Sequence, residues 1–146
     1  MAGEVKGLAE PALVLTLPRD ATDLDDGQLT ASEVAQLKLN ADWVVLSACN
    51  TAAGDKPGAE ALSGLARAFF YAGARALLVS HWRLDSEAAI RLTTGTFEAL
   101  QKDPSIGRAE ALRRAMLAYL SDTSNPWNAY PDYWGSFSIV GEGSAR

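Results

Sequence analysis

The chain has 146 residues, of which 48% are hydrophobic and 21% charged, a composition typical of one globular domain that spans residues 1–146. Its net charge is -5 and its basic residues are scattered among acidic ones, which argues against nucleic acid or an anionic membrane as a partner. No apolar run approaches the roughly 20 residues that a bilayer span needs, and the first residues lack a signal-peptide layout, so we expect a cytoplasmic protein.

The sequence contains one cysteine, Cys49, and one histidine, His81. A single cysteine cannot form an internal disulfide, and these two residues cannot supply the three or four ligands of a zinc site. We therefore expect neither a metal nor another cofactor.

The first part of the chain predicts a strand, a turn and a helix. Residues 11–18, PALVLTLP, are typical of an edge strand or of one arm of a hairpin, and the polar segment that follows ends in an Asp-Gly turn. Thr30 as N-cap and Glu33 as its capping-box partner then predict a short helix with Val34 and Leu37 on its buried side. Asn40 is a suitable residue to end that helix.

The middle of the chain predicts two buried strands with a helix between them. WVVLSAC, residues 43–49, is apolar on both faces, which is typical of a central strand covered by helices above and below. Apolar residues at helical spacing predict a helix over residues 58–71 that Gly73 ends. ARALLVSHW, residues 74–82, predicts the second apolar strand.

The last part predicts two helices and a final strand. Asp85 or Ser86 is expected to cap a helix that Pro104 ends, and Ser105 to open the next one. The expected apolar stripe of the first helix consists of Ile90, Thr94, Phe97 and Leu100, and that of the second of Ile106, Ala109, Leu112, Met116 and Tyr119 or Leu120. A polar, proline-rich loop over residues 121–133 leads to a strand in WGSFSIVG. This alternation predicts an α/β fold with a largely parallel sheet between helices.

Cys49 is a candidate catalytic residue because ligands and catalytic groups collect beyond the carboxyl ends of strands in open α/β sheets. Free cysteine is also among the most frequently buried residue types, so it could instead be a small core residue. The polar segment after Cys49 favours exposure, and the backbone amides around Asn50, Thr51 and Gly54 could hold an oxyanion beside the sulfur.

A catalytic thiolate needs a base, usually histidine. His81 falls at the end of the second apolar strand, where it could lie beside Cys49. It could equally be a packed, hydrogen-bonded residue or part of a substrate groove. The residues alone leave these alternatives open.

Five blocks in order resemble the C-terminal two thirds of a CHAT domain, a caspase-like cysteine peptidase domain often found beside tetratricopeptide repeats. They are EPALVLTLP, DGQLTASEV, VVLSACNTAAG, GAEALSGLARAFFYAGARALLVSHWRLDSEAA and YPDYWGSFSIVG, within residues 3–143. The resemblance implies a caspase-like three-layer sandwich, a mostly parallel sheet with helices on both faces, that is incomplete on its N-terminal side. It also implies a Cys–His dyad with Cys49 as the nucleophile.

The dyad histidine of the family lies in an ATHG-like motif upstream of the segment with which this chain begins, so the resemblance does not assign that role to His81. We therefore expect a fragment or a truncated product that is inactive as an endopeptidase when alone. By analogy with caspases, the segment after the second apolar strand would line the substrate groove. The expected substrate contacts are Ser80, Trp82, Arg83 and Asp85, and for Asp85 a role as helix cap is at least as well supported.

The expected partners are a peptide or protein substrate and a tetratricopeptide-repeat region of a longer protein. An unpaired edge on the cysteine strand would also favour self-association. The alternative to a peptidase is a non-catalytic protein–protein interaction module of caspase-like fold. A small-anion binder is the weakest hypothesis, because the loop after Cys49 has neither of the glycine spacings of known phosphate loops.

Overall fold

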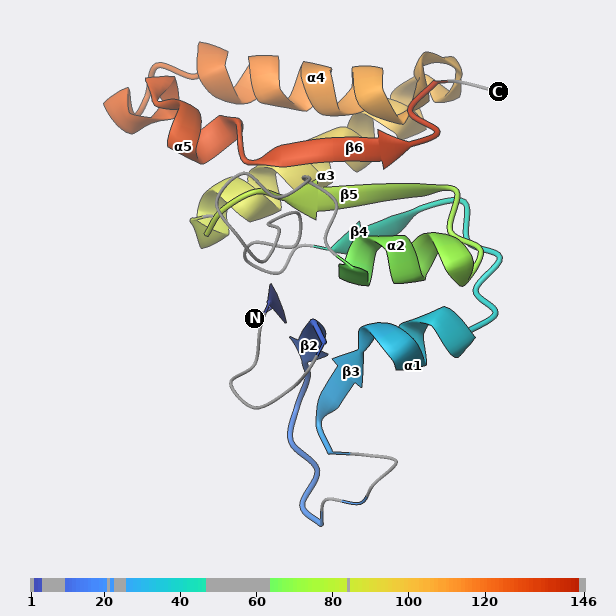
Figure 1. Ribbon diagram of the computed structural model, residues 1–146. Coiled ribbons are helices and arrows are strands. Elements are labelled where there is room, and N and C mark those ends of the chain that lie inside the picture. Colours follow the sequence, from blue (N-terminus) through green and yellow to red (C-terminus); the bar gives the residue numbers. More distant parts are fainter. Residues whose placement is uncertain are drawn as a thin grey trace.

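The computed structural model describes residues 2–3, 10–20, 22, 26–46, 64–83 and 85–144. Two three-stranded sheets and the helices around them make up this part of the chain (Figure 1). None of the helices in the described ranges is both long and apolar enough to cross a membrane.

The first sheet is antiparallel, with the strand order β1-β2-β3. It consists of β1 (Ala2–Gly3), β2 (Ala12–Val14) and β3 (Gln28–Thr30), with Leu13 opposite Leu29. The strand predicted in residues 11–18 therefore exists and forms one arm of a hairpin with β3. It is not an edge strand, because β1 pairs with its other side.

The second sheet carries the candidate site and has the order β4-β5-β6. In it β4 (Val44–Leu46) runs parallel to β5 (Ala76–Ser80), and β6 (Phe137–Gly141) runs antiparallel to β5. The described part of the sheet is thus mixed rather than largely parallel. β5 is the central strand and is fully buried, as its apolar sequence predicts.

Strand β4 differs from its prediction. Among the described residues it pairs with β5 alone, so it lies at the edge of the sheet and not at its centre. Val45 is 36% exposed for the same reason. An apolar strand sequence reports which residues can be buried, and it does not report whether a neighbouring strand is present.

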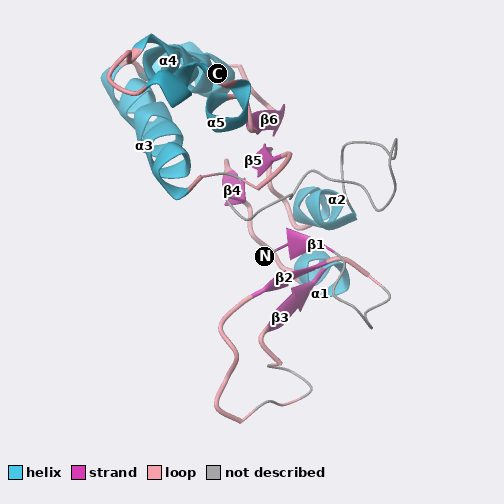
Figure 2. Ribbon diagram, turned by 90° about the vertical axis from the view of Figure 1, so that its left-hand side faces the viewer, coloured by secondary structure: helices cyan, strands magenta, loops and turns pink. Residues whose placement is uncertain are grey.

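Helices lie on both faces of this sheet (Figure 2). On one face, α1 (Ala31–Gln36) and α2 (Gly64–Tyr71) pack against Leu46, Leu77 and Val79. On the other face, α3 (Ser86–Lys102) and α4 (Gly107–Ser121) pack against Leu78 and Phe137. The alternation of Leu77 and Leu78 between the two cores follows from the two-residue repeat of a strand.

The helix ends follow local chemistry. The predicted capping box is present, with the Thr30 backbone N–H donating to Glu33 Oε2 over 2.8 Å, and α1 buries Val34 completely. Gly73 ends α2 with a φ of 97°, a conformation that glycine adopts without strain. Two expectations were wrong: Leu37 is exposed as the C-cap of α1, and Asn40 lies three residues beyond that cap.

The buried face of α3 is not the predicted one. Ile90 is 62% exposed and Phe97 is also exposed, whereas Ala88, Leu92 and Thr96 are buried. The reason is close packing against α4: a Cβ added to Gly95 would lie 3.3 Å from the Cβ of Ala115. Small residues form this helix contact, and a search for large apolar residues selects the wrong stripe.

In α4, Leu112 and Tyr119 are buried as predicted, while Ala109 and Leu120 are exposed. Pro104 begins a short 3₁₀ helix, η1 (Pro104–Ile106), and α4 begins at Gly107 rather than at Ser105. The predicted loop before β6 contains two short helices, η2 (Pro126–Ala129) and α5 (Pro131–Trp134). Each starts at a proline, which fits the first helical turn because that turn needs no N–H donor.

Candidate functional site

The predicted nucleophile and its loop lie outside the described residues. This applies to Cys49 and to the expected oxyanion residues Asn50, Thr51 and Gly54. The described chain leads up to them through β4, whose last residue, Leu46, is paired with Val79 of β5. Because the two strands are parallel, their carboxyl ends lie at the same edge of the sheet.

Ser80 is the last residue of β5 and lies opposite Phe137 of β6. Its side chain is buried, with 1% of the residue exposed. Its position in the strand pairing places it under the carboxyl edge of the sheet, where it supports the residues that follow more readily than it contacts a ligand directly.

His81 is held against β6 through two hydrogen bonds. Its backbone N–H donates to the Ser136 carbonyl oxygen over 2.9 Å. Its Nε2 lies 2.7 Å from the Ser138 hydroxyl oxygen, a distance typical of a hydrogen bond. The ring is half-buried, so the imidazole is fixed in orientation on the side of β5 where Ser138 lies.

Trp82 is partly exposed and is anchored to α5. Its indole Nε1–H donates to the carbonyl oxygen of Asp132 over 3.1 Å, and its ring centroid lies 6.2 Å from that of His81. Arg83, the next residue, is exposed. The bond to Asp132 connects the end of β5 to the segment that precedes β6.

Asp85 is the N-cap of α3, as one of its two predicted roles required. Its Oδ1 accepts hydrogen bonds from the backbone N–H groups of Glu87 and Ala88, over 3.0 and 3.1 Å. These groups have no partner within the helix, so an acidic cap stabilises both the donors and the helix dipole.

Three of the four predicted substrate contacts lie at the carboxyl end of β5: Ser80, Trp82 and Arg83. The fourth, Asp85, is the N-cap of α3. Residues that the sequence reasoning missed are Ser136 and Ser138, which hold His81. Ser136 acts through its backbone carbonyl and Ser138 through its hydroxyl, and the pairing register that sets both beside His81 is not readable from the sequence.

An ion pair joins α3 to the end of α4, between Arg91 and Asp122. Arg91 Nη2 donates to Asp122 Oδ2 over 2.7 Å, and the Arg91 guanidinium lies 4.4 Å from the centroid of the Tyr119 ring. Hydrogen bonds from the Ser124 side chain and backbone, together with Arg91, lower the pKa of Asp122 to about 2. Burial raises the pKa of Tyr119, so its phenol stays protonated at neutral pH.

Comparison with known proteins identifies one family for this chain. The family model described as CHAT domain matches residues 4–142. Tetratricopeptide repeat protein 28 from Mus musculus is 28% identical over 126 residues, which cover 84% of this chain and 5% of that protein. The chain therefore spans about a twentieth of the length of this relative. No solved structure matches the chain. Since the family model covers nearly the whole sequence, the chain belongs to the CHAT domain family.

Proposed function

We propose that this chain is the nucleophile-bearing part of a caspase-like cysteine endopeptidase, with Cys49 as the nucleophile. The observation that carries the proposal is the parallel pairing of β4 with β5, which sets the two carboxyl ends at one edge of the sheet. Cys49 follows Leu46 by three residues, a stretch of at most about 11 Å. Family membership supports the same position for the thiol.

The chemistry is acyl transfer to sulfur. The Cys49 thiolate attacks the carbonyl carbon of a peptide bond, and backbone amides around Asn50, Thr51 and Gly54 stabilise the oxyanion that forms. The C–N bond then breaks, the dyad histidine gives a proton to the leaving amine, and a thioester remains on Cys49. Water attacks the thioester carbonyl, and its hydrolysis restores the thiol and releases the acid.

The histidine of this dyad is not His81 in our proposal. The hydrogen bond between His81 Nε2 and Ser138 supports a positioning role for this ring beside β6. We place the dyad histidine on another segment of the polypeptide, in a strand that pairs with the outer side of β4. Val45 of β4 is partly exposed, and the ring centroid of the exposed Phe97 lies 5.0 Å from that of Trp43, which precedes β4. This apolar surface supports a covering segment there.

The remaining assignments follow from that arrangement. Trp82 and Arg83 contact the substrate, Ser80 supports them from below, and Asp85 fixes the start of α3. A tetratricopeptide-repeat region in the same longer protein presents the substrate, a partner suggested by the name of the mouse relative. The three-layer, caspase-like sandwich becomes complete when the covering segment is in place.

The test compares this chain with a longer polypeptide that contains the dyad histidine motif, on a panel of fluorogenic peptides. The longer polypeptide should cleave at least one peptide, its Cys49→Ala variant none, and the 146-residue chain none. Turnover by the 146-residue chain that depends on Cys49 would contradict the placement of the histidine. Turnover by the longer Cys49→Ala variant would contradict the nucleophile.

The exposed apolar residues beside β4 favour a second candidate, a non-catalytic interaction module of the same fold. Alkylation of the longer polypeptide with iodoacetamide separates the two. A thiolate activated for attack reacts at neutral pH much faster than an ordinary thiol. Slow alkylation of Cys49 together with partner binding would favour the interaction module.

A further inference from the structure

Two large aromatic side chains stand outward in the segment before β6. Trp127 is 58% exposed and Tyr130 is 55% exposed, and their ring centroids lie 5.4 Å apart. Tryptophan is highly buried on average in folded proteins, and exposed Trp and Tyr are enriched at binding surfaces. We call this pair, together with the adjacent Asp132, the aromatic ledge.

The segment below the ledge is held in place by specific bonds. Asn125 Oδ1 accepts from the Trp127 backbone N–H over 3.1 Å, and the Tyr130 N–H donates to the Trp127 carbonyl over 3.0 Å. The buried Asn128 donates through Nδ2 to the Asp122 carbonyl oxygen over 2.9 Å. The backbone that carries the ledge is therefore held in place before any ligand arrives, which lowers the entropic cost of binding.

The neighbouring residues anchor the other side of the segment. Tyr133 and Trp134 pack against the core between the sheet, α3 and α4. Trp82 donates to the Asp132 carbonyl oxygen, which fixes α5 against the end of β5. The segment thus has an inward aromatic pair, Tyr133 and Trp134, that packs on the core, and an outward pair, Trp127 and Tyr130, that is more than half exposed.

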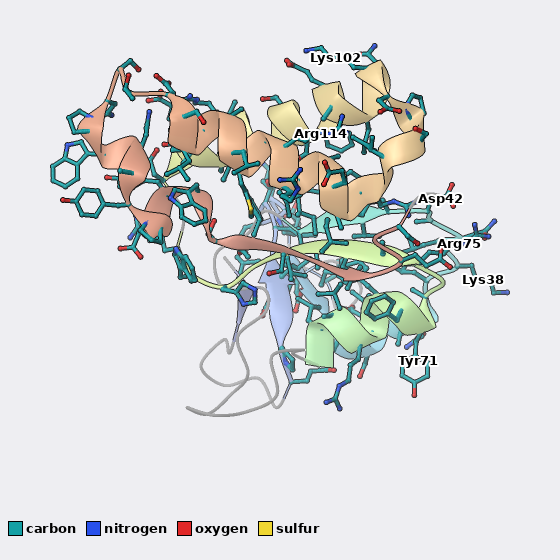
Figure 3. The ribbon with its side chains drawn as sticks, turned by 90° about the horizontal axis from the view of Figure 1, so that it is seen from above. Lys38, Asp42, Tyr71, Arg75, Lys102 and Arg114 are labelled. Atoms are coloured by element: carbon teal, nitrogen blue, oxygen red, sulfur yellow. The ribbon has the colours of Figure 1, made fainter. Side chains whose placement is uncertain are left out.

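The segment that carries the ledge contains acidic residues and no basic ones. The sequence has no Lys or Arg between Arg114 and Arg146, and Asp132 is exposed and makes no ion pair with any residue in the described ranges. Arg91 is paired with Asp122 at 2.7 Å, so its charge is balanced within the described residues. Figure 3 shows Lys38 at the far end of the sheet from α5, together with Arg75 and Asp42, which form an ion pair at 2.9 Å.

We propose that the aromatic ledge binds a lysine or arginine side chain in an extended basic segment of another protein. The cation lies over the faces of Trp127 and Tyr130, which attract it through their ring quadrupoles, and Asp132 supplies the opposite charge. This inference does not depend on Cys49 being a nucleophile, because the ledge is a binding surface and takes no part in the acyl transfer.

The experiment measures fluorescence anisotropy of a labelled Gly/Ser peptide that carries two arginines, added to the 146-residue chain. Matched peptides replace both arginines by lysine, by the neutral isostere citrulline or by glutamate. The arginine and lysine peptides should bind, and the citrulline and glutamate peptides should bind at least fivefold more weakly. Equal binding of the arginine and citrulline peptides would overturn the proposal, since it would show that the positive charge is not recognised.

Variants locate the binding. Trp127→Ala and Tyr130→Ala should each weaken binding of the arginine peptide about two- to fivefold, and Asp132→Asn should also weaken it and reduce its salt dependence. The matched control is Tyr71→Ala, because Tyr71 is an aromatic residue on α2 that is 84% exposed and points away from the ledge (Figure 3). All four side chains are exposed, so circular dichroism should be unchanged. Loss of binding in Tyr71→Ala, or full binding in Trp127→Ala, would refute the location.

Discussion

Replacement of Asp85 distinguishes its two possible roles, helix cap and substrate contact. In Asp85→Ala the backbone N–H groups of Glu87 and Ala88 lose their common acceptor, Oδ1, which lies 3.0 and 3.1 Å away. Loss of an N-cap acceptor costs about 1 kcal/mol of unfolding free energy. For a chain of this size that corresponds to a decrease in Tm of about 2–4 °C.

The assay is thermal unfolding followed by circular dichroism, with urea titration as a second measure of the free energy. Asp85→Ser is the matched variant, because serine caps about as well as aspartate and should keep nearly all of the stability. In the longer polypeptide that we propose to be active, the two variants should leave KM unchanged.

Two results would refute this reasoning. An unchanged Tm in Asp85→Ala would show that the cap contributes nothing measurable. A large rise in KM in Asp85→Ser, with unchanged Tm, would show that Asp85 contacts the substrate and that the cap is secondary.

Three further predictions test the described fold. Leu92→Ala should destabilise the chain by about 2–5 kcal/mol in urea titration, because Leu92 is fully buried. Ile90→Ala, on the exposed face of α3, should change stability by less than about 0.5 kcal/mol. The reverse order of the two effects would show that the face predicted from the sequence is the buried one. Gly141→Ala should lower the free energy of unfolding by about 1–3 kcal/mol, because φ is 93° and the new Cβ would lie 2.5 Å from the Arg75 carbonyl oxygen. Gly64→Ala in α2 should be neutral or stabilising, because its new Cβ would lie 3.4 Å from the Pro11 Cγ, an ordinary contact. The pKa of Asp122 is lowered from 3.8 to about 2, so its ionised form stabilises the fold above pH 3.8 and that contribution is lost as the pH falls toward 2. Asp122→Asn should therefore lose less stability than the wild type between pH 5 and pH 2. Identical profiles of stability against pH for the two proteins would contradict the lowered pKa of Asp122.

Local signals in the sequence were sufficient for the starts of α1 and α3 and for the buried strand β5. Thr30 and Glu33 form the capping box that their spacing predicts, since both partners lie within one turn. Residues 76–80 form the buried strand β5, because an apolar run on both faces of a strand is typical of a strand that is covered on both sides.

Non-local packing explains what the sequence did not show. The buried face of α3 depends on Gly95 meeting Ala115 of α4, a contact between small residues twenty positions apart. The hydrogen bond of His81 depends on the register between β5 and β6, which places Ser138 opposite Val79. The edge position of β4 depends on which strand lies on its outer side, a property that its own residues do not encode.

The candidate site was predictable in part for the same reasons. The cap role of Asp85 is local, and the sequence supported it at least as well as a substrate contact. The hydrogen bond from Trp82 to the Asp132 carbonyl oxygen joins residues fifty positions apart, so no local sequence motif predicts it. The role that we propose for Cys49 rests on family membership and on the strand that leads to it.

The pH dependence of Cys49 alkylation tests most directly the claim that the activating histidine is not His81. The rate of iodoacetamide modification is measured from pH 5 to pH 10 in the 146-residue chain, in its His81→Ala variant and in the longer polypeptide. Our account predicts the same profile for the chain and for His81→Ala, with an apparent pKa near the ordinary thiol value of about 8.5, and a lower pKa in the longer polypeptide. A lowered pKa in the 146-residue chain that returns to the ordinary value in His81→Ala would contradict it.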